Sequence, residues 1–282
     1  DTETTGLNPL TADLIGLSFC FEKNIAYYVH VPEGKENEVA QEFKAFFEHP
    51  EIEKIAQNLK YDYKVISKYG IHLSLPYFDT MLAHYLLEPD QRHNMDILAQ
   101  NYLNYSPISI ETLIGKKGKN QLSMRQAPLE KVYPYACEDA DITYQLKNIF
   151  QKELEGSESL KILNDIEHPL IPVLSKMELE GIKIDTIALA EFSKELEDRL
   201  VELNDNVQKL AGAQFNLSSP KQLGQILFEH MKLVDKPKKT KTGQYSTSED
   251  TLLKLKGKHE IIDEILEFRQ LQKLKSTYVD AL

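Results

Sequence analysis

Two runs of strand-forming residues near the start of the chain constrain its fold most. The segments ADLIGLSFCFEK (12–23) and NIAYYVHV (24–31) are rich in β-branched and aromatic residues and meet at a short polar turn, Glu22-Lys23-Asn24. With the DTE segment (1–3) as a third strand, they predict a three-stranded meander. After a further short strand, KIAQ (54–57), the pattern is helical, which predicts an α/β protein with its strands first.

Helical periodicity accounts for most of the remaining sequence. In the first part we expect helices in ENEVAQEFKAFFEH (36–49), NLKYDYKVISKYG (58–70), FDTMLAHYLL (78–87), NMDILAQNYL (94–103) and PLEKVYPYACEDADITYQLKNIFQKEL (128–154). Asp79 is a candidate N-cap, and Pro128 suits a first helical turn. The polar break EGSES (155–159) predicts a boundary between a first domain, 1–154, and a nearly all-helical second domain, 155–282.

Composition excludes several classes of protein. The chain of 282 residues is 41% hydrophobic and 27% charged, and it lacks the run of about 18 apolar residues that a membrane span needs. No secretory leader is recognisable, so a cytoplasmic protein without membrane contact is expected. Cys20 and Cys137 are the only cysteines and are expected to be reduced, packed thiols.

Charge gives a mixed indication about nucleic acid. The net charge of −11, taken alone, argues against nucleic-acid binding. However, KLVDKPKKTKTGQ (232–244) contains five lysines and one acid. Such a run is either a solvated loop or a contact to phosphates, and the sequence leaves both interpretations open.

Four carboxylates stand in positions that need an explanation. Asp1 and Glu3 are two residues apart, so on a strand they project from the same face. Asp62 lies on the apolar face of its predicted helix, and Asp139 lies within the apolar stripe of the 128–154 helix, one turn after Tyr135. Asp141, at about 200° from Asp139, is expected to be solvated.

A buried carboxylate is costly unless a cation or hydrogen-bond donors compensate it. One compensation is an ion pair with a buried arginine or lysine, or a role as a helix cap. The first domain contains only two arginines, Arg92 and Arg125, which weakens this alternative. The other is a metal. An all-oxygen ligand set selects Mg²⁺ or Mn²⁺, and such sites suit the chemistry of phosphate esters.

Three motifs in the first domain resemble a known family. DTETTGL, QNLKYDY and YACEDAD are similar to the three exonuclease motifs of the proofreading domain of bacterial, family A DNA polymerase I. The later segments FNLSSPKQLGQILFE, YSTSED and LEFRQLQKLKSTY resemble the start of the polymerase domain, mainly its thumb. The resemblance implies a ribonuclease H-like exonuclease domain, with a mixed sheet flanked by helices, followed by a mainly α-helical thumb segment.

The resemblance also implies roles for individual residues. Asp1, Glu3, Asp62 and Asp139 would hold two divalent cations, Mg²⁺ or Mn²⁺, and Tyr135 would orient the attacking water. A groove for the single-stranded 3′ end of DNA would be lined by Leu7, Gln57, Asn58 and Tyr61. Contacts to the duplex backbone would come from Lys238, Lys239, Lys241, Arg269 and Lys273. For each groove residue the alternative is an ordinary turn, cap or core position.

The function implied is a 3′→5′ exodeoxyribonuclease that proofreads DNA by two-metal hydrolysis. The palm motifs of the polymerase are not found in these residues, so polymerisation is expected of a longer parent protein and not of this chain. The alternatives are a ribonuclease D-like exoribonuclease and a non-catalytic, DNA-binding scaffold. A monomer is expected. We also expect residues upstream of Asp1 in the parent, without which an α-ammonium beside the ligands would weaken metal binding.

Overall fold

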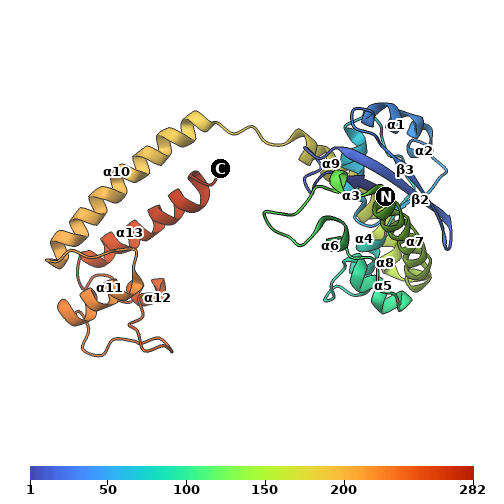
Figure 1. The fold of residues 1–282 in the computed structure, drawn as a ribbon. Helices are drawn as coiled ribbons and strands as arrows, with labels where there is room; N and C mark the ends of the chain where they lie inside the picture. Colours follow the sequence, from blue (N-terminus) through green and yellow to red (C-terminus); the bar gives the residue numbers. More distant parts are fainter. The chain divides into compact units, whose positions relative to one another are not determined.

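The computed structural model describes residues 1–282, which form two compact units, Asp1–Gly181 and Ile182–Leu282 (Figure 1). Each unit has its own hydrophobic core. None of the helices combines the length and the apolar character that crossing a membrane requires.

The first unit begins with an antiparallel sheet in the order β1-β2-β3. Its strands are β1 (Thr2–Thr4), β2 (Leu14–Glu22) and β3 (Ile25–His30). The predicted meander is therefore confirmed. Gly16 in β2 permits the close passage of Tyr28, because a Cβ at this glycine would lie 2.2 Å from the Tyr28 hydroxyl oxygen.

A second, two-stranded parallel sheet pairs β4 (Lys54–Ala56) with β5 (Tyr77–Asp79). The sequence predicted β4 but not β5. Three residues are too few to show the alternation of a half-buried strand, and all three residues of β5 are buried.

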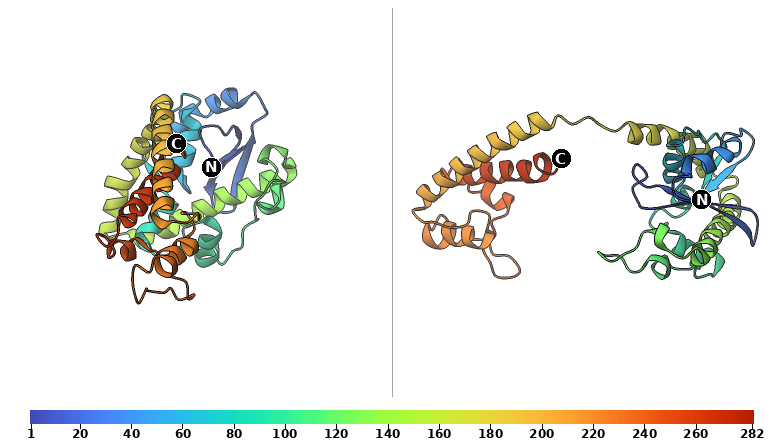
Figure 2. Two further views of the ribbon diagram at one scale, coloured as in Figure 1. Left: turned by 90° about the vertical axis from the view of Figure 1, so that its left-hand side faces the viewer. Right: turned by 45° about the horizontal axis from the view of Figure 1, so that its top comes forward.

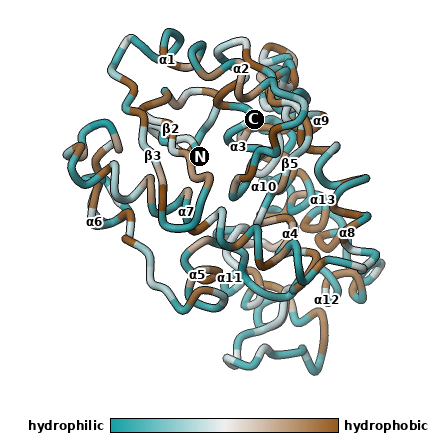
Figure 3. The backbone as a smooth tube through the Cα atoms, turned by 90° about the vertical axis from the view of Figure 1, so that its right-hand side faces the viewer, coloured by the Kyte–Doolittle hydropathy of each residue, from teal (hydrophilic) through white to brown (hydrophobic).

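Helices cover both sheets of the first unit. They are α1 (Glu36–Glu42), α2 (Lys44–Phe47), α3 (Leu59–Ser67), α4 (Thr80–Leu87), α5 (Met95–Leu103), α6 (Glu111–Ile114), the 3₁₀ turn η1 (Met124–Gln126), α7 (Leu129–Leu154), α8 (Glu158–Ile162), the π-helical turn η2 (Leu163–Glu167) and α9 (His168–Glu180). The long helix α7 packs against β2, β3, α4 and α5. Both hydrophilic and hydrophobic residues occur along these helices, as amphipathic packing requires (Figure 3).

The first unit continues past the boundary expected at residue 154. Leu163 belongs to the hydrophobic core around α7, and Ile171 belongs to the core around β2 and α3. The backbone N–H of Asp79 donates to Nε2 of buried His168 at 3.2 Å, and Glu178 forms ion pairs with Lys60 and Lys64 of α3. Helices α8 and α9 are thereby part of the first unit in this structure.

The second unit is helical. It consists of α10 (Thr186–Ala211), α11 (Pro220–Gln225), the π-helical turn η3 (Ile226–His230), α12 (Glu249–Leu253), α13 (Ile261–Lys273) and the π-helical turn η4 (Leu274–Val279). Asp185 caps α10 by accepting from the N–H groups of Ile187 and Ala188. Helices α10 and α13 lie side by side and share one apolar core (Figures 1 and 2).

Candidate active site

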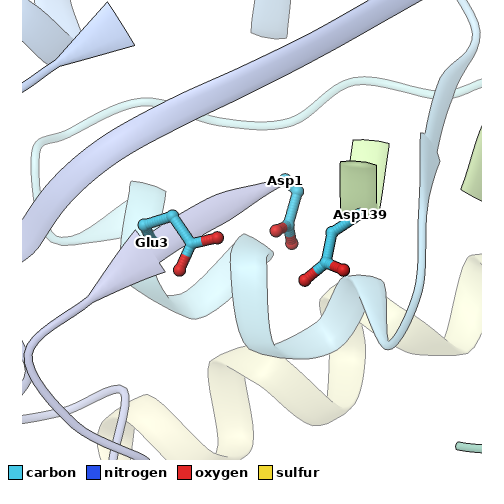
Figure 4. A group of neighbouring side chains, drawn as sticks. All are labelled: Asp1, Glu3 and Asp139. Atoms are coloured by element: carbon cyan, nitrogen blue, oxygen red, sulfur yellow. The ribbon is translucent and has the colours of Figure 1, made fainter. Parts of the chain in front are cut away.

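Three of the four predicted carboxylates converge. Ligand oxygens of Asp1, Glu3 and Asp139 all lie within 4.8 Å of one another (Figure 4). Asp1 and Glu3 project from the same face of the first strand because side chains alternate along it. Asp139 approaches them from the middle of α7, which packs on the sheet. The two motifs meet in space although they are more than a hundred residues apart in sequence.

Asp62 is buried directly beside this group, but it faces the backbone of β1. Its Oδ1 accepts hydrogen bonds from the Thr2 N–H at 3.0 Å and from the Thr2 hydroxyl at 2.6 Å. Thr2 lies between Asp1 and Glu3 and points to the opposite face. The carboxylate of Asp62 therefore fixes the strand that carries the other two acids.

Burial dominates the electrostatics of the site. It raises the pKa of Glu3 to about 8, with nearby Asp139 and Asp62 adding to the effect and the α-ammonium of Asp1 opposing it. It raises the pKa of Asp139 to about 7, against the lowering effect of a hydrogen bond from Tyr135. The pKa of Asp62 is also raised, again mainly by burial. Ionised carboxylates are thus unfavourable here in the absence of a cation.

The donor set fits a hard divalent cation. Oε1 of Glu3 is buried without any hydrogen-bond partner. Lysine and arginine form no ion pair with Glu3, Asp62 or Asp139. Arg125, one of the two arginines in the first domain, pairs with Glu36 at 2.8 Å. An orphaned carboxylate oxygen beside two more carboxylates fits a divalent cation, which is one of the two compensations that the sequence left open.

Tyr135 lies one helical turn before Asp139, and its hydroxyl is close enough to the Asp139 carboxylate for each group to shift the pKa of the other. Burial and the neighbouring acids Asp139 and Glu3 raise the pKa of Tyr135, so the phenol stays protonated at neutral pH and serves as a donor. A role of Tyr135 in orienting a water stays a prediction.

The residues predicted to line a groove fall into two groups. Leu7 is 92% exposed on the turn after β1, and the Tyr61 hydroxyl holds that turn by contacts with Thr4 Oγ1 at 2.5 Å and the Gly6 carbonyl at 2.6 Å. Gln57 and Asn58 form the turn between β4 and α3, where Asn58 adopts a left-handed conformation with φ of 66°.

Asp79 fixes the turn that contains Gln57 and Asn58, and it caps two helices, of which the sequence predicted one. As predicted, it caps α4 by accepting from the N–H groups of Met81 and Leu82. It also accepts from the N–H groups of Asn58 and Leu59, at the start of α3. Burial nevertheless raises the pKa of Asp79 to about 6.

The prediction that Asp141 is only solvated is wrong. Its Oδ1 accepts a hydrogen bond from the Asn24 N–H at 2.7 Å and a weaker one from the Cys20 thiol, and its Oδ2 accepts from Gln145. Asp141 therefore ties α7 to the β2–β3 turn. Helical periodicity could not reveal this, because the partner turn lies 117 residues away in sequence.

Glu138 is a structural residue that the sequence analysis missed. Its two carboxylate oxygens accept from the Tyr105 hydroxyl at 2.5 Å and from the Ile108 N–H at 2.6 Å. It thereby attaches the segment after α5 to α7, next to Asp139. Its position beside a predicted ligand was the only signal in the sequence.

In the second unit the predicted DNA-contacting residues are found in two settings. Lys238, Lys239 and Lys241 are exposed on a loop that closes through pairing of Lys239 with Tyr245. Lys273 lines a groove of about 600 Å³ together with Tyr245 and Gln272. Arg269 lines the same groove but donates to the carbonyl and hydroxyl of Thr247, so its guanidinium already has partners within the chain.

Comparison with known proteins agrees with this geometry. Residues 1–155 match the family model described as 3′-5′ exonuclease, and residues 186–282 match that of DNA polymerase family A. The chain belongs to the 3′-5′ exonuclease family. The resemblance to family A DNA polymerases is thereby confirmed, and the match of 186–282 argues against a ribonuclease D-like protein.

Relatives of the whole chain carry the name DNA polymerase I. Those of Pseudomonas aeruginosa and Borreliella burgdorferi are each 40% identical over 100% of this chain, which spans 32% and 31% of their lengths. Among solved structures, the POL domain of Pol1 from M. smegmatis, in complex with a DNA primer-template and dNTP, matches with a TM-score of 0.75 and 26% identity. That match covers 95% of this chain and 43% of the other. The chain thus spans about a third of the curated relatives it matches.

Proposed function

We propose that this chain hydrolyses the 3′-terminal phosphodiester of DNA and releases nucleoside 5′-monophosphates. The observation that carries the proposal is the convergence of Asp1, Glu3 and Asp139, with one buried Glu3 oxygen left without a partner, in a domain of the 3′-5′ exonuclease family. DNA is favoured over RNA as the substrate because residues 186–282 match a DNA polymerase family.

Asp1, Glu3, Asp62 and Asp139 are the residues that would hold two divalent cations, Mg²⁺ or Mn²⁺. When bound, such cations supply Lewis-acid activation of a water and neutralise charge on the leaving 3′ oxygen. The chain's own contribution is a rigid arrangement of ligands. Asp62 holds β1 through Thr2, so Asp1 and Glu3 keep their orientation toward Asp139.

Other residues position the substrate. Tyr135, a protonated donor beside Asp139, would hold the attacking water by its hydroxyl oxygen. Leu7 is exposed and would pack against the terminal bases as an apolar wedge. Gln57, Asn58 and Tyr61 would line the path of the single strand.

A single-turnover assay tests the proposed function. A 5′-labelled single-stranded DNA is incubated with the chain in Mg²⁺ or Mn²⁺, and an RNA of the same sequence is run beside it. We expect degradation of the DNA that stops on addition of a chelator. Degradation that continues in the chelator would contradict the proposal, as would a preference for the RNA. An inert but folded and DNA-binding chain would identify a scaffold.

Replacing Tyr135 by phenylalanine tests the role of its hydroxyl. We expect hydrolysis to slow by about 10- to 100-fold, the usual effect of losing the orientation of one reacting group. The hydrogen bond from Tyr135 lowers the pKa of Asp139, so the pH at which metal-free Asp139 ionises should rise in the variant. Carbon-13 NMR of the Asp139 carboxyl would measure this pH. Tyr133→Phe, on an exposed tyrosine of the same helix, is the matched control and should change neither quantity.

Duplex binding by the second unit is a separate prediction. Replacing Lys238, Lys239 and Lys241 with alanine should reduce the slope of log affinity against log salt concentration by about 3 on duplex DNA, near 0.9 per lost phosphate contact. Fluorescence anisotropy with a primer-template duplex would measure it. Alanine at Lys194, Lys209 and Lys254, exposed lysines outside this loop, is the control. An equal slope for the loop variant and the unmodified chain would show that the loop is merely solvated.

A further inference from the structure

A short lysine-rich loop in the first unit has no role in the site described above. The loop Gly115–Asn120, called here the lysine loop, carries Lys116, Lys117 and Lys119, all exposed. None of the three amines has a carboxylate partner, although other lysines of this unit form ion pairs. From Thr112 to Leu129 the chain has no acidic residue, in a protein whose net charge is −11.

Both ends of the lysine loop are held firmly. Before it, Leu113 is buried, and after it, Met124 is buried in the same small cluster with Ile15 and Val132. The N–H of Leu122 donates to the Ile114 carbonyl at 2.9 Å and closes the base of the loop. In Figures 1 and 2 the green segment after α6 extends outward from the first unit.

The base of the lysine loop lies against the elements that carry the candidate ligands. The turn η1, which contains Met124, contacts strand β1 of Glu3, and Tyr135 packs against the cluster around Met124. Glu138, next to Asp139, binds the segment that leads into α6. Lys119 is five residues from Met124, so the loop can reach at most about 18 Å from this base.

The lysine loop can attract a nucleic-acid strand that the acidic carboxylate site would repel. The carboxylate site alone repels a nucleic-acid strand, and a strand that enters it needs cationic contacts close by. Arg125, the other cation of this stretch, is committed to Glu36 and to the carbonyls of Leu14 and Val31. The three lysines are free to bind phosphates. Gly115 and Gly118 have positive φ, and no atom lies within 4 Å of the position that a Cβ would take at either glycine, so the loop backbone is open to a strand.

We propose that the lysine loop binds the phosphodiester backbone of the single strand whose 3′ end enters the carboxylate site. The inference rests on the proposed function, because that function supplies the strand. The contacts are to phosphates, so they are independent of base sequence and weaken with salt.

Binding measured without hydrolysis tests this proposal. The 282-residue chain and its Lys116→Ala, Lys117→Ala, Lys119→Ala variant are titrated into a fluorescent single-stranded oligodeoxythymidylate in a chelator, at a series of salt concentrations. The slope of log affinity against log salt should fall by about 2, since each phosphate contact on a single strand contributes about 0.7. The triple arginine variant should keep the slope of the unmodified chain.

Two comparisons make the outcome decisive. Alanine at Lys152, Lys161 and Lys176, three exposed lysines of α7, α8 and α9, removes the same charge and should leave the slope unchanged. On a blunt duplex, the alanine variant of the lysine loop should show nearly the same slope as the unmodified chain. An unchanged slope of the loop variant on the single strand would overturn the proposal. An equal reduction of the slope in the control variant, or on the duplex, would also overturn it. This binding test does not depend on hydrolysis. A chain that is inactive in the hydrolysis assay would therefore refute the proposed function, and the binding result could still be interpreted.

Discussion

Replacing Asp139 by alanine is expected to reduce 3′-terminal hydrolysis by about a hundred- to a thousandfold, the scale of losing one group that stabilises transition-state charge. Asp139 is the only one of the three converging carboxylates that α7 contributes. Its loss would also remove the carboxylate beside the Tyr135 hydroxyl. The substitution removes an unfavourable buried charge, so the fold should persist.

Single-turnover degradation of a labelled DNA would measure this loss. Asp141→Ala is the matched control, because Asp141 lies two residues away on the same helix and binds the β2–β3 turn, not the site. That variant should lose some stability and keep its hydrolytic rate. If Asp139→Ala retained a rate within tenfold or so of the unmodified chain, the assignment of the site would be wrong.

Replacing Glu3 by glutamine is expected to stabilise the metal-free first unit at about pH 8 by roughly 2–4 kcal/mol. The folded pKa of Glu3, about 8, is above its ordinary value of 4.5 because of burial first and of Asp139 second. A group with a raised folded pKa contributes stability that is fully present below pH 4.5 and is lost as the pH rises through 8. Glutamine keeps the shape and carries no charge, so the variant escapes that loss.

Urea unfolding of the first unit in a chelator, at about pH 5 and about pH 9, would measure the difference. The unmodified chain should be less stable at the higher pH, and the variant should change less. Added Mg²⁺ should restore stability to the unmodified chain at high pH, because a ligand that binds only the folded state stabilises it. Equal pH dependence of the two proteins would contradict the electrostatic account of Glu3.

Local periodicity was sufficient to place several site residues. Alternation along a strand put Asp1 and Glu3 on one face, and the 3.6-residue repeat put Asp62 and Asp139 on buried helix faces, as the structure shows. These features depend on a few neighbouring residues. The similarity of three short motifs to an exonuclease family then predicted that the four acids belong together.

Contacts between distant segments were beyond such reasoning. The hydrogen bonds from Thr2 to Asp62 and from Asn24 to Asp141 span 60 and 117 residues, and no local pattern encodes them. The attachment of α8 and α9 to the first unit depends on Leu163, Ile171 and His168 finding partners in β5 and two cores. The match to the exonuclease family ends at residue 155, beside the polar EGSES break, whereas the compact unit continues to Gly181 because these apolar side chains are buried.

The direction of degradation tests the central claim most directly. A DNA primer with a mismatched 3′ end is labelled at its 5′ end, annealed to a template and incubated with the chain in Mg²⁺. The account predicts a ladder of 5′-labelled products that shorten one nucleotide at a time from the 3′ end, with release of nucleoside 5′-monophosphates. The account would be contradicted by internal cuts or by release of nucleoside 3′-monophosphates. Early appearance of the 5′ label in a mononucleotide would also contradict it, because degradation would then start from the 5′ end.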